Sequence, residues 1–379
     1  MKKLLLLMCV AIISLPAGAA TTSDDDLKQR VAELDELSLM AAESYKDLAD
    51  NLAHRMTVSG YADAEYSTST QDGYHPGFRL HHLSLFFKKQ ISDKWRFFSE
   101  IEYEDAPFME WGFNPTAAPN ACDHDCNGAV FVEAVNIDYL WRPELSLRAG
   151  RFFTPAGIWS IDHYPPFVPT QVVPMFIGQV FPRVFDGGLA YGIHKVGNTF
   201  LSYDVYAGNG ENNPGSGDQN STTAYGVKLN LALPVLKQFD IGTTYYSDGK
   251  LTPFEGMYDG DKKTAYGFHA KLRFNRFTVQ SEYGKAKFEP LTAASYDNEG
   301  YYAQFLYDIS NWLVGYRYDY YDPDTAVTTN STVDNAVFVN YRATKDVVLK
   351  LEHHQVDEKD PALEDYAKDI ASVVVNLGN

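Results

Sequence analysis

From Met56 to the end of the chain, apolar or aromatic residues recur at every second position in short runs, with polar residues between them. This period-two pattern is typical of β-strands whose two faces differ in chemistry. The first five runs read TVSGYADAEYS, FRLHHLSLFFKKQ, WRFFSEIEYE, AVFVEAVNIDYLW and LSLRAGRFF. Eleven more lie near 185–195, 199–208, 223–233, 238–247, 264–274, 277–288, 299–309, 312–322, 334–343, 347–357 and 366–377. The sequence therefore predicts sixteen strands and an all-β fold.

The connections between these runs alternate between short and long. Seven short turns fall at 92–94, 142–144, 196–198, 234–237, 275–276, 310–311 and 344–346. Eight longer segments rich in Gly, Asp, Asn and Pro lie near 68–77, 105–128, 154–184, 209–222, 248–263, 289–298, 323–333 and 358–365. Such alternation is typical of an even-stranded antiparallel transmembrane barrel with short turns at its periplasmic end and long loops outside.

The chemistry of the two strand faces distinguishes a membrane barrel from a soluble one. The run that begins at Trp95 carries Phe97 and Ile101 on one face, and Glu100 and Glu102 on the other. A ring of sixteen strands is too wide for side chains to fill, so its interior holds water and tolerates charge. The apolar face must then contact lipid, and the 23 Phe and 26 Tyr residues fit aromatic girdles. The alternative is a soluble exported β-sandwich or solenoid.

The N-terminal residues indicate export. Lys2 and Lys3 precede an apolar stretch and then small residues up to Ala20, so we expect residues 1–20 to be a cleaved secretory signal peptide. With a barrel in residues 56–379, this pattern predicts an outer-membrane location.

Residues 21–55 carry a different periodicity. Eight positions follow one another at alternating steps of four and three, which is a heptad seam: Leu27, Val31, Leu34, Ser38, Ala41, Tyr45, Leu48 and Leu52. We expect an N-terminal periplasmic coiled-coil helix, which would associate with other copies. A single amphipathic helix or a disordered segment is the alternative.

Two cysteines remain after cleavage of the signal peptide. Cys122 and Cys126, in the segment CDHDC, are expected to form a disulfide in an oxidising compartment. A metal site that also uses His124 is the alternative for this segment.

The remaining residues point to neither a cofactor nor catalysis. Adjacent residues of a strand face opposite ways, so neither the pair His81 and His82 nor the pair His353 and His354 is expected to chelate one ion. We therefore predict no metal ion and no cofactor. Serines and histidines occur without a motif that joins them into a catalytic set, so an enzyme is not expected. A net charge of −18 makes nucleic acid an improbable partner.

The segment 154–184 is the longest connection and is unusually apolar for a loop. Exposure of such a loop to water would be costly, and unstructured loops beyond about 15 residues are usually functional or disordered. We therefore expect it to fold into the barrel lumen as a constriction loop, with Trp159, Phe167 and Phe176 packed against the inner wall.

Three stretches resemble the phosphate-selective porins of the O and P type and their outer-membrane relatives. They are RLHHLSLFFKKQISDKWRFFSEIEYE, LSLRAGRFFTPAGIWSIDHYPPF and VFPRVFDGGLAYG. The resemblance implies sixteen strands, a homotrimer and a third loop that narrows the channel. The lysine and arginine clusters that select phosphate in that family are not evident in 154–184, so phosphate specificity is not carried over.

Together these patterns predict a passive diffusion channel for small hydrophilic solutes, with anions among the candidates. The expected constriction residues are Asp162, His163, Arg183, Arg148 and Arg151. Residues expected to line the pore by strand parity are Glu100, Glu102, Lys228, Lys271, Arg273, Arg317, Asp319, Arg342 and Lys350. The expected partners are outer-membrane lipids, further copies of the chain and the permeant solutes. The alternatives are a structural anchor tethered through the coiled coil, or a barrel that sheathes a partner protein.

Overall fold

The computed structural model describes residues 56–105, 129–211, 222–234, 238–249, 262–290 and 293–378, together with Met40. The chain divides into two compact units, Met1–Arg55 and Met56–Asn379. The predicted signal peptide, the coiled coil around Met40, and Cys122 and Cys126 lie outside the described residues. Among the residues that the structure describes, no helix is both long and apolar enough to cross a membrane.

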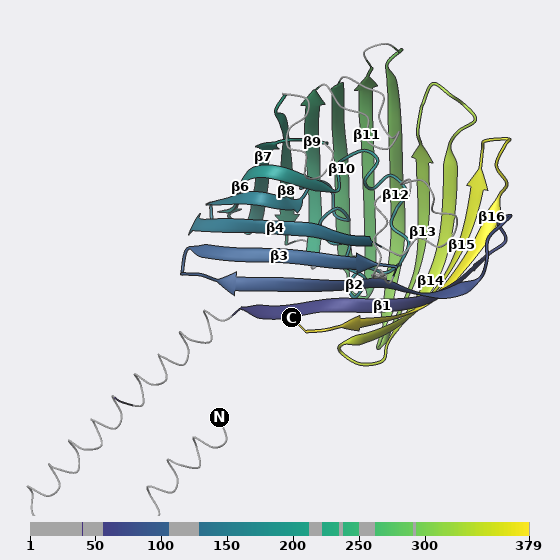
Figure 1. The fold of residues 1–379 in the computed structure, drawn as a ribbon, viewed down its shortest axis with the longest axis horizontal. Helices are drawn as coiled ribbons and strands as arrows, with labels where there is room; N and C mark the ends of the chain where they lie inside the picture. Colours follow the sequence, from purple (N-terminus) through teal and green to yellow (C-terminus); the bar gives the residue numbers. More distant parts are fainter. Residues whose placement is uncertain are drawn as a thin grey trace, which may run out of the picture. The chain divides into compact units, whose positions relative to one another are not determined.

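The described residues of the second unit form a closed antiparallel barrel of sixteen strands, as predicted. Each strand pairs with its sequence neighbours, and β1 pairs with β16, so in Figure 1 the purple first strand lies beside the yellow last strand. The strands are β1 (Thr57–Ser69), β2 (Gly77–Gln90), β3 (Trp95–Glu104), β4 (Ala129–Arg142), β5 (Leu145–Phe153), β6 (Val184–Val196), β7 (Thr199–Gly208), β8 (Ala224–Leu233), β9 (Gln238–Gly249), β10 (Lys262–Phe274), β11 (Phe277–Glu289), β12 (Tyr296–Ile309), β13 (Trp312–Asp322), β14 (Thr332–Arg342), β15 (Val347–Glu358) and β16 (Tyr366–Asn376).

The outer surface of the barrel is apolar and exposed. Phe268, Phe305 and Leu351 expose 57%, 53% and 61% of their surface, while inward neighbours such as Arg317 and His354 are buried. This arrangement is the reverse of a soluble protein and suits a surface that contacts lipid.

Paired aromatic rings mark both ends of this apolar surface. Near the short turns, Trp95 lies 4.8 Å from Tyr139 and Trp312 lies 4.6 Å from Tyr341, measured between ring centroids. Near the long loops, Tyr66 and Phe78 are 4.8 Å apart. Aromatic girdles of this kind sit at the two interfaces of a membrane barrel.

Two β-bulges interrupt the pairing of the first four strands. In the β1–β2 pair Asp63 lies opposite His82 and Ala64 opposite Leu80, so His81 is an extra residue. In the β3–β4 pair Glu100 lies opposite Ala134 and Ile101 opposite Val132, so Glu133 is extra. A bulge changes the alternation of side chains in the strand that contains it.

The connection between β5 and β6, residues 154–183, packs inside the barrel; we call it the lumenal loop. Trp159, Val168, Phe176 and Val180 are almost fully buried in a cluster with inward residues of the strands. The prediction of an inward loop is confirmed, and so is the packing of Trp159 and Phe176. The prediction for Phe167 is wrong, since its side chain is 69% exposed.

Candidate functional site

Acidic side chains of the barrel wall hold the lumenal loop by its backbone N–H groups. Glu282 on β11 accepts hydrogen bonds from the N–H groups of Ile158 at 2.7 Å and Trp159 at 3.0 Å. Two further wall carboxylates do the same farther along the loop: Glu352 accepts from Gln171 N–H at 2.6 Å and Asp319 from Met175 N–H at 2.9 Å. Hydrogen bonds to charged acceptors are stronger than neutral ones, so the loop is firmly attached to the wall.

Basic side chains hold the carbonyl groups of the same loop. Lys228 donates to the Gly157 carbonyl at 2.5 Å, and Lys350 donates to the Val168 carbonyl at 3.0 Å. Arg317 donates to the Thr170 hydroxyl at 2.8 Å and to the Val172 carbonyl at 2.9 Å. Along the loop, backbone carbonyl groups thus accept hydrogen bonds from basic side chains of the wall, and backbone N–H groups donate hydrogen bonds to acidic ones.

These contacts change what the predicted pore-lining charges do. Lys228, Arg317, Asp319 and Lys350 face the lumen, as parity indicates, but their exposed fractions are 9%, 0%, 0% and 1%. They are covered by the loop that they bind. Whether any of them also borders the solute path stays a prediction.

Gly157 shows how closely the loop approaches the wall. Its backbone φ is +52°, in the left-handed region that favours glycine. A Cβ atom at this position would lie 1.7 Å from an Oε atom of Glu282. Only glycine fits both the backbone conformation and the contact.

A cavity of about 90 Å³ lies on the side of the loop that faces the long connections, and we call it the outer chamber. Glu102, Glu104 and Glu133 line it together with Arg183 and several histidine and aromatic side chains. Three carboxylates against one guanidinium give this chamber an acidic character.

A second cavity of about 280 Å³ lies toward the short turns, and we call it the inner chamber. Asp162 and Lys271 line it, along with Gln280 and Gln304. Trp159 and Val168 line both cavities, so this part of the loop separates the two chambers.

The five predicted constriction residues do not lie together in one site. His163 and Arg183 line the outer chamber, whereas Asp162 lines the inner chamber. Arg148 is bound to Asp138 at 2.7 Å, and Arg151 is bound to Asp186 by two contacts of 2.7 Å. Neither of these two arginines lines a chamber that holds the other three residues.

The pKa of His163 limits its role as a cation. Burial and the nearby charge of Arg183 lower this pKa from its usual value to about 4. Its ring packs against Phe153, with centroids 4.6 Å apart. His163 is therefore neutral near pH 7, whereas the guanidinium of Arg183 is a permanent cation of the outer chamber.

The remaining predicted pore residues have varied surroundings. Glu100 accepts hydrogen bonds from Ser84 at 2.7 Å and from the Tyr164 hydroxyl at 3.1 Å, and Glu102 accepts one from Tyr61. Near the short turns, Arg342 bonds to Asp308 at 2.9 Å, and Arg273 is exposed.

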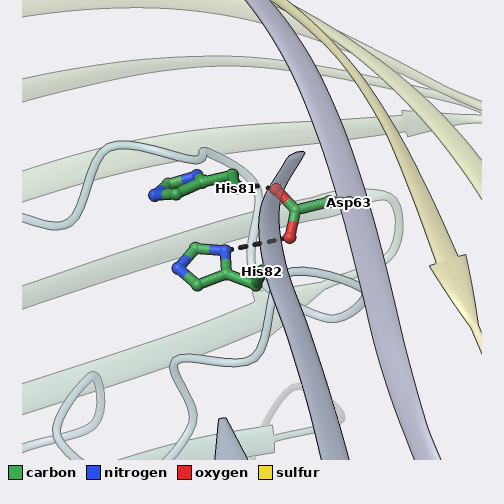
Figure 2. Close-up of side chains that lie close together, drawn as sticks. All are labelled: Asp63, His81 and His82. Carbon is green, nitrogen blue, oxygen red and sulfur yellow. Dashed lines mark hydrogen bonds and ion pairs between the residues drawn. The ribbon is translucent and has the colours of Figure 1, made fainter. Parts of the chain in front are cut away.

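The expectation that His81 and His82 face opposite sides of the strand is wrong. The bulge at His81 turns both rings toward Asp63, and Figure 2 shows a dashed contact from each ring to its carboxylate. The ring centroids are 3.6 Å apart. Glu133 was also missed, although a lone glutamate in the apolar face of AVFVEAV could have indicated a bulge.

We compared the chain with known protein families, sequences and structures. No protein-family model matches the sequence. An uncharacterized protein of Aquifex aeolicus (strain VF5) is 29% identical over 156 residues, which is 41% of this chain and 32% of that protein, so the match spans about a third of the relative's length.

Solved outer-membrane proteins share the barrel at low sequence identity. OprB of Pseudomonas putida has a TM-score of 0.58 at 9% identity, with 88% of this chain and 96% of that chain covered. The outer-membrane channel DcaP of Acinetobacter baumannii has a TM-score of 0.56 at 12% identity, with 86% and 98% covered. A loop-deletion variant of OmpT of Vibrio cholerae has a TM-score of 0.56 at 11% identity, with 86% and 99% covered. At these identities the likeness shows the fold.

Proposed function

We propose that this chain is an outer-membrane porin, a passive diffusion channel for small hydrophilic solutes. The observation that carries the proposal is the inverted barrel, apolar outside and charged inside, with a loop that leaves a polar chamber on each of its sides. A lipid-facing exterior requires a membrane, and a barrel of this width encloses a space for water and solutes. The similar fold of an outer-membrane channel, DcaP, supports the same proposal.

For the sign of the permeant ions, we favour cations over the anions that the sequence had suggested. Several inward cations are buried beneath the lumenal loop, whereas Glu102, Glu104 and Glu133 line the outer chamber. Fixed charges select permeant ions by sign.

Reconstitution tests both parts of this proposal. Liposomes that contain the protein should swell with small sugars, and planar bilayers should show a reversal potential that favours K⁺ over Cl⁻. The triple variant E102Q/E104Q/E133Q should lose that preference, while E289Q, at a half-buried glutamate that lines neither chamber, should keep it. If neither swelling nor conductance is observed, the result would instead favour a structural anchor or a barrel that sheathes a partner protein.

We also propose a homotrimer, as the resemblance implies. A structure of OmpT from Vibrio cholerae is described as a trimer form, and its barrel is similar to this one with a TM-score of 0.53. Chemical cross-linking in native membranes should give a ladder that ends at three chains.

A further inference from the structure

A group of metal-ligand side chains lies on the inner wall where β1 and β2 pair. Asp63, His81 and His82 place one ligand atom each within 4.8 Å of the others. Figure 2 shows the two rings and the carboxylate turned toward one another. The bulge at His81 creates this arrangement, because in a regular strand one of the two rings would face away.

The distances between these atoms suit a tetrahedral ion. Asp63 Oδ1 lies 2.9 Å from His82 Nδ1, and Asp63 Oδ2 lies 3.5 Å from His81 Nδ1. Glu65 lies beside this group, with its Oε2 3.3 Å from His81 Nδ1. Two ligands bound at about 2.1 Å to a tetrahedral Zn²⁺ lie about 3.4 Å apart, and both Asp63 contacts lie within about 0.5 Å of this separation.

Two of these atoms have unmet bonding capacity. His81 Nδ1 and Glu65 Oε2 are buried and lie 3.3 Å apart, but neither makes a hydrogen bond with suitable geometry. Buried polar atoms without a hydrogen bond are rare in folded proteins, and an ion at this place would satisfy both. The side chains of Asp63 and Glu65 are 0% and 1% exposed, so their charges lie in a poorly hydrated environment.

We propose that Asp63, His81 and His82 bind a divalent first-row transition-metal ion, with the Glu65 carboxylate beside the site. Two imidazole nitrogens with carboxylate oxygens suit Zn²⁺ and its neighbours, whereas Mg²⁺ and Ca²⁺ prefer oxygen ligands alone. Gln171 of the lumenal loop donates to Asp63 Oδ2 at 2.8 Å and so orients that carboxylate.

The outer chamber provides a route to the site. His82 lines this chamber with Glu102 and Glu104, and these three side chains form a second group with metal-ligand spacing. An ion that enters the acidic chamber thus meets His82 first. In this proposal Asp63, His81 and His82 form the binding site, and Glu102 and Glu104 lie on the path by which the ion reaches it.

Arg79 opposes binding and must move. Its Nη2 lies 3.0 Å from His81 Nε2, and its Nε donates to Glu65 at 2.8 Å. If His81 Nδ1 binds a metal ion, the proton of the neutral imidazole must lie on Nε2. This N–H would then face the Arg79 guanidinium, which can donate but not accept a hydrogen bond. Arg79 is 42% exposed and also bonds Asp105 at 3.2 Å, so it can withdraw toward that residue.

The test is Zn²⁺ binding to the full-length protein purified in detergent, measured by competition with a chromophoric chelator. The background carries C122S/C126S, because CDHDC offers other ligands. We expect one Zn²⁺ per chain, and a loss of affinity of at least about 10-fold in each of H81Q and H82Q. A 100-fold excess of Mg²⁺ should not displace the ion.

His353 supplies the matched control. Its Nδ1 lies 2.8 Å from Asp369 on the outer face, which is a single His-Asp pair without a second ring. H353Q should bind Zn²⁺ as the background does. Loss in H353Q, or full binding in both H81Q and H82Q, would overturn the assignment, and so would an absence of bound Zn²⁺ in the background.

Cobalt substitution keeps the proposal testable if the histidine variants do not fold. Co²⁺ bound to the C122S/C126S protein should give d–d bands of a nitrogen and oxygen site, and a featureless spectrum counts against the site. Metal-free conductance is measured separately, so failure of the metal site and failure of the channel are distinguishable.

Discussion

The carboxylate of Glu282 on β11 accepts a hydrogen bond from the backbone N–H of Trp159 at 3.0 Å, and so joins the barrel wall to the lumenal loop. The same carboxylate binds Ile158 N–H and accepts from the Tyr302 hydroxyl at 2.6 Å. Glu282 is thus one of several wall side chains that hold the loop, and its contribution can be measured.

Replacement of Glu282 by Gln should loosen the lumenal loop. The amide lacks the negative charge and has one acceptor oxygen in place of two, so each lost charged hydrogen bond costs about 1.5–3 kcal/mol. Single-channel recordings of E282Q should show a larger and noisier conductance than the unchanged protein. E289Q, at the half-buried last residue of the same strand, should conduct as the unchanged protein does. Equal conductance in all three proteins would contradict this role of Glu282.

Gly157→Ala should displace the loop by a steric route. The new Cβ would meet Glu282 and would also hold a left-handed backbone, at a cost of roughly 1–2 kcal/mol. We expect increased conductance for G157A. Gly197 has a φ of +64° but no atom within 4 Å of an added Cβ, so G197A carries the backbone cost alone. If both variants conduct alike, contact with Glu282 does not set the loop position.

The low pKa of His163 predicts which variant changes ion selectivity. At pH 7 His163 is neutral, so H163Q should leave the reversal potential unchanged. R183Q removes the cation of the outer chamber and should shift the reversal potential further toward K⁺. A shift in H163Q as large as that in R183Q would mean that His163 is charged.

The same pKa gives the loop a dependence on pH. The folded pKa of about 4 lies below the value of about 6.5 expected for an unfolded histidine, so unfolded chains bind more protons between these values. The contribution of His163 to loop docking is complete above pH 6.5 and declines as the pH falls toward 4. Conductance noise should rise over this range in the unchanged protein and less in H163Q.

Arg79→Gln should tighten Zn²⁺ binding, because it removes the donor that faces His81 Nε2 and frees Glu65. We expect at least a several-fold gain in the competition assay. R273Q, at an exposed position near the short turns, is the control and should bind as before. Weaker binding in R79Q would show that Arg79 supports the ion rather than opposing it.

Much of the fold could be predicted from the sequence, because the period-two pattern directly reflects the contrast between lipid and lumen. The predicted run 185–195 differs from β6, Val184–Val196, by one residue at each end. Parity correctly assigned Arg317 and Lys350 to the inner face, since neither strand contains a bulge.

The functional detail was less accessible to sequence reasoning. Strand alternation predicts that the Lys350 side chain points into the lumen. It does not predict that Lys350 binds the Val168 carbonyl of the lumenal loop, which is far away in the sequence. A bulge is set by pairing between strands, so the inward turn of His81 and Glu133 is not encoded by alternation within one strand. These two residues contribute to the candidate metal site and the outer chamber.

The pairing of β1 with β16 has a consequence for biogenesis. Nine residue pairs, from Tyr61 with Asn376 to Ser69 with Lys368, join strands at opposite ends of the sequence. A chain that lacks the eleven residues of β16 would present the free edges of both β1 and β15 to hydrocarbon, where unpaired backbone groups cost several kcal/mol each. Closure of the barrel in the bilayer must therefore wait until β16 has been made.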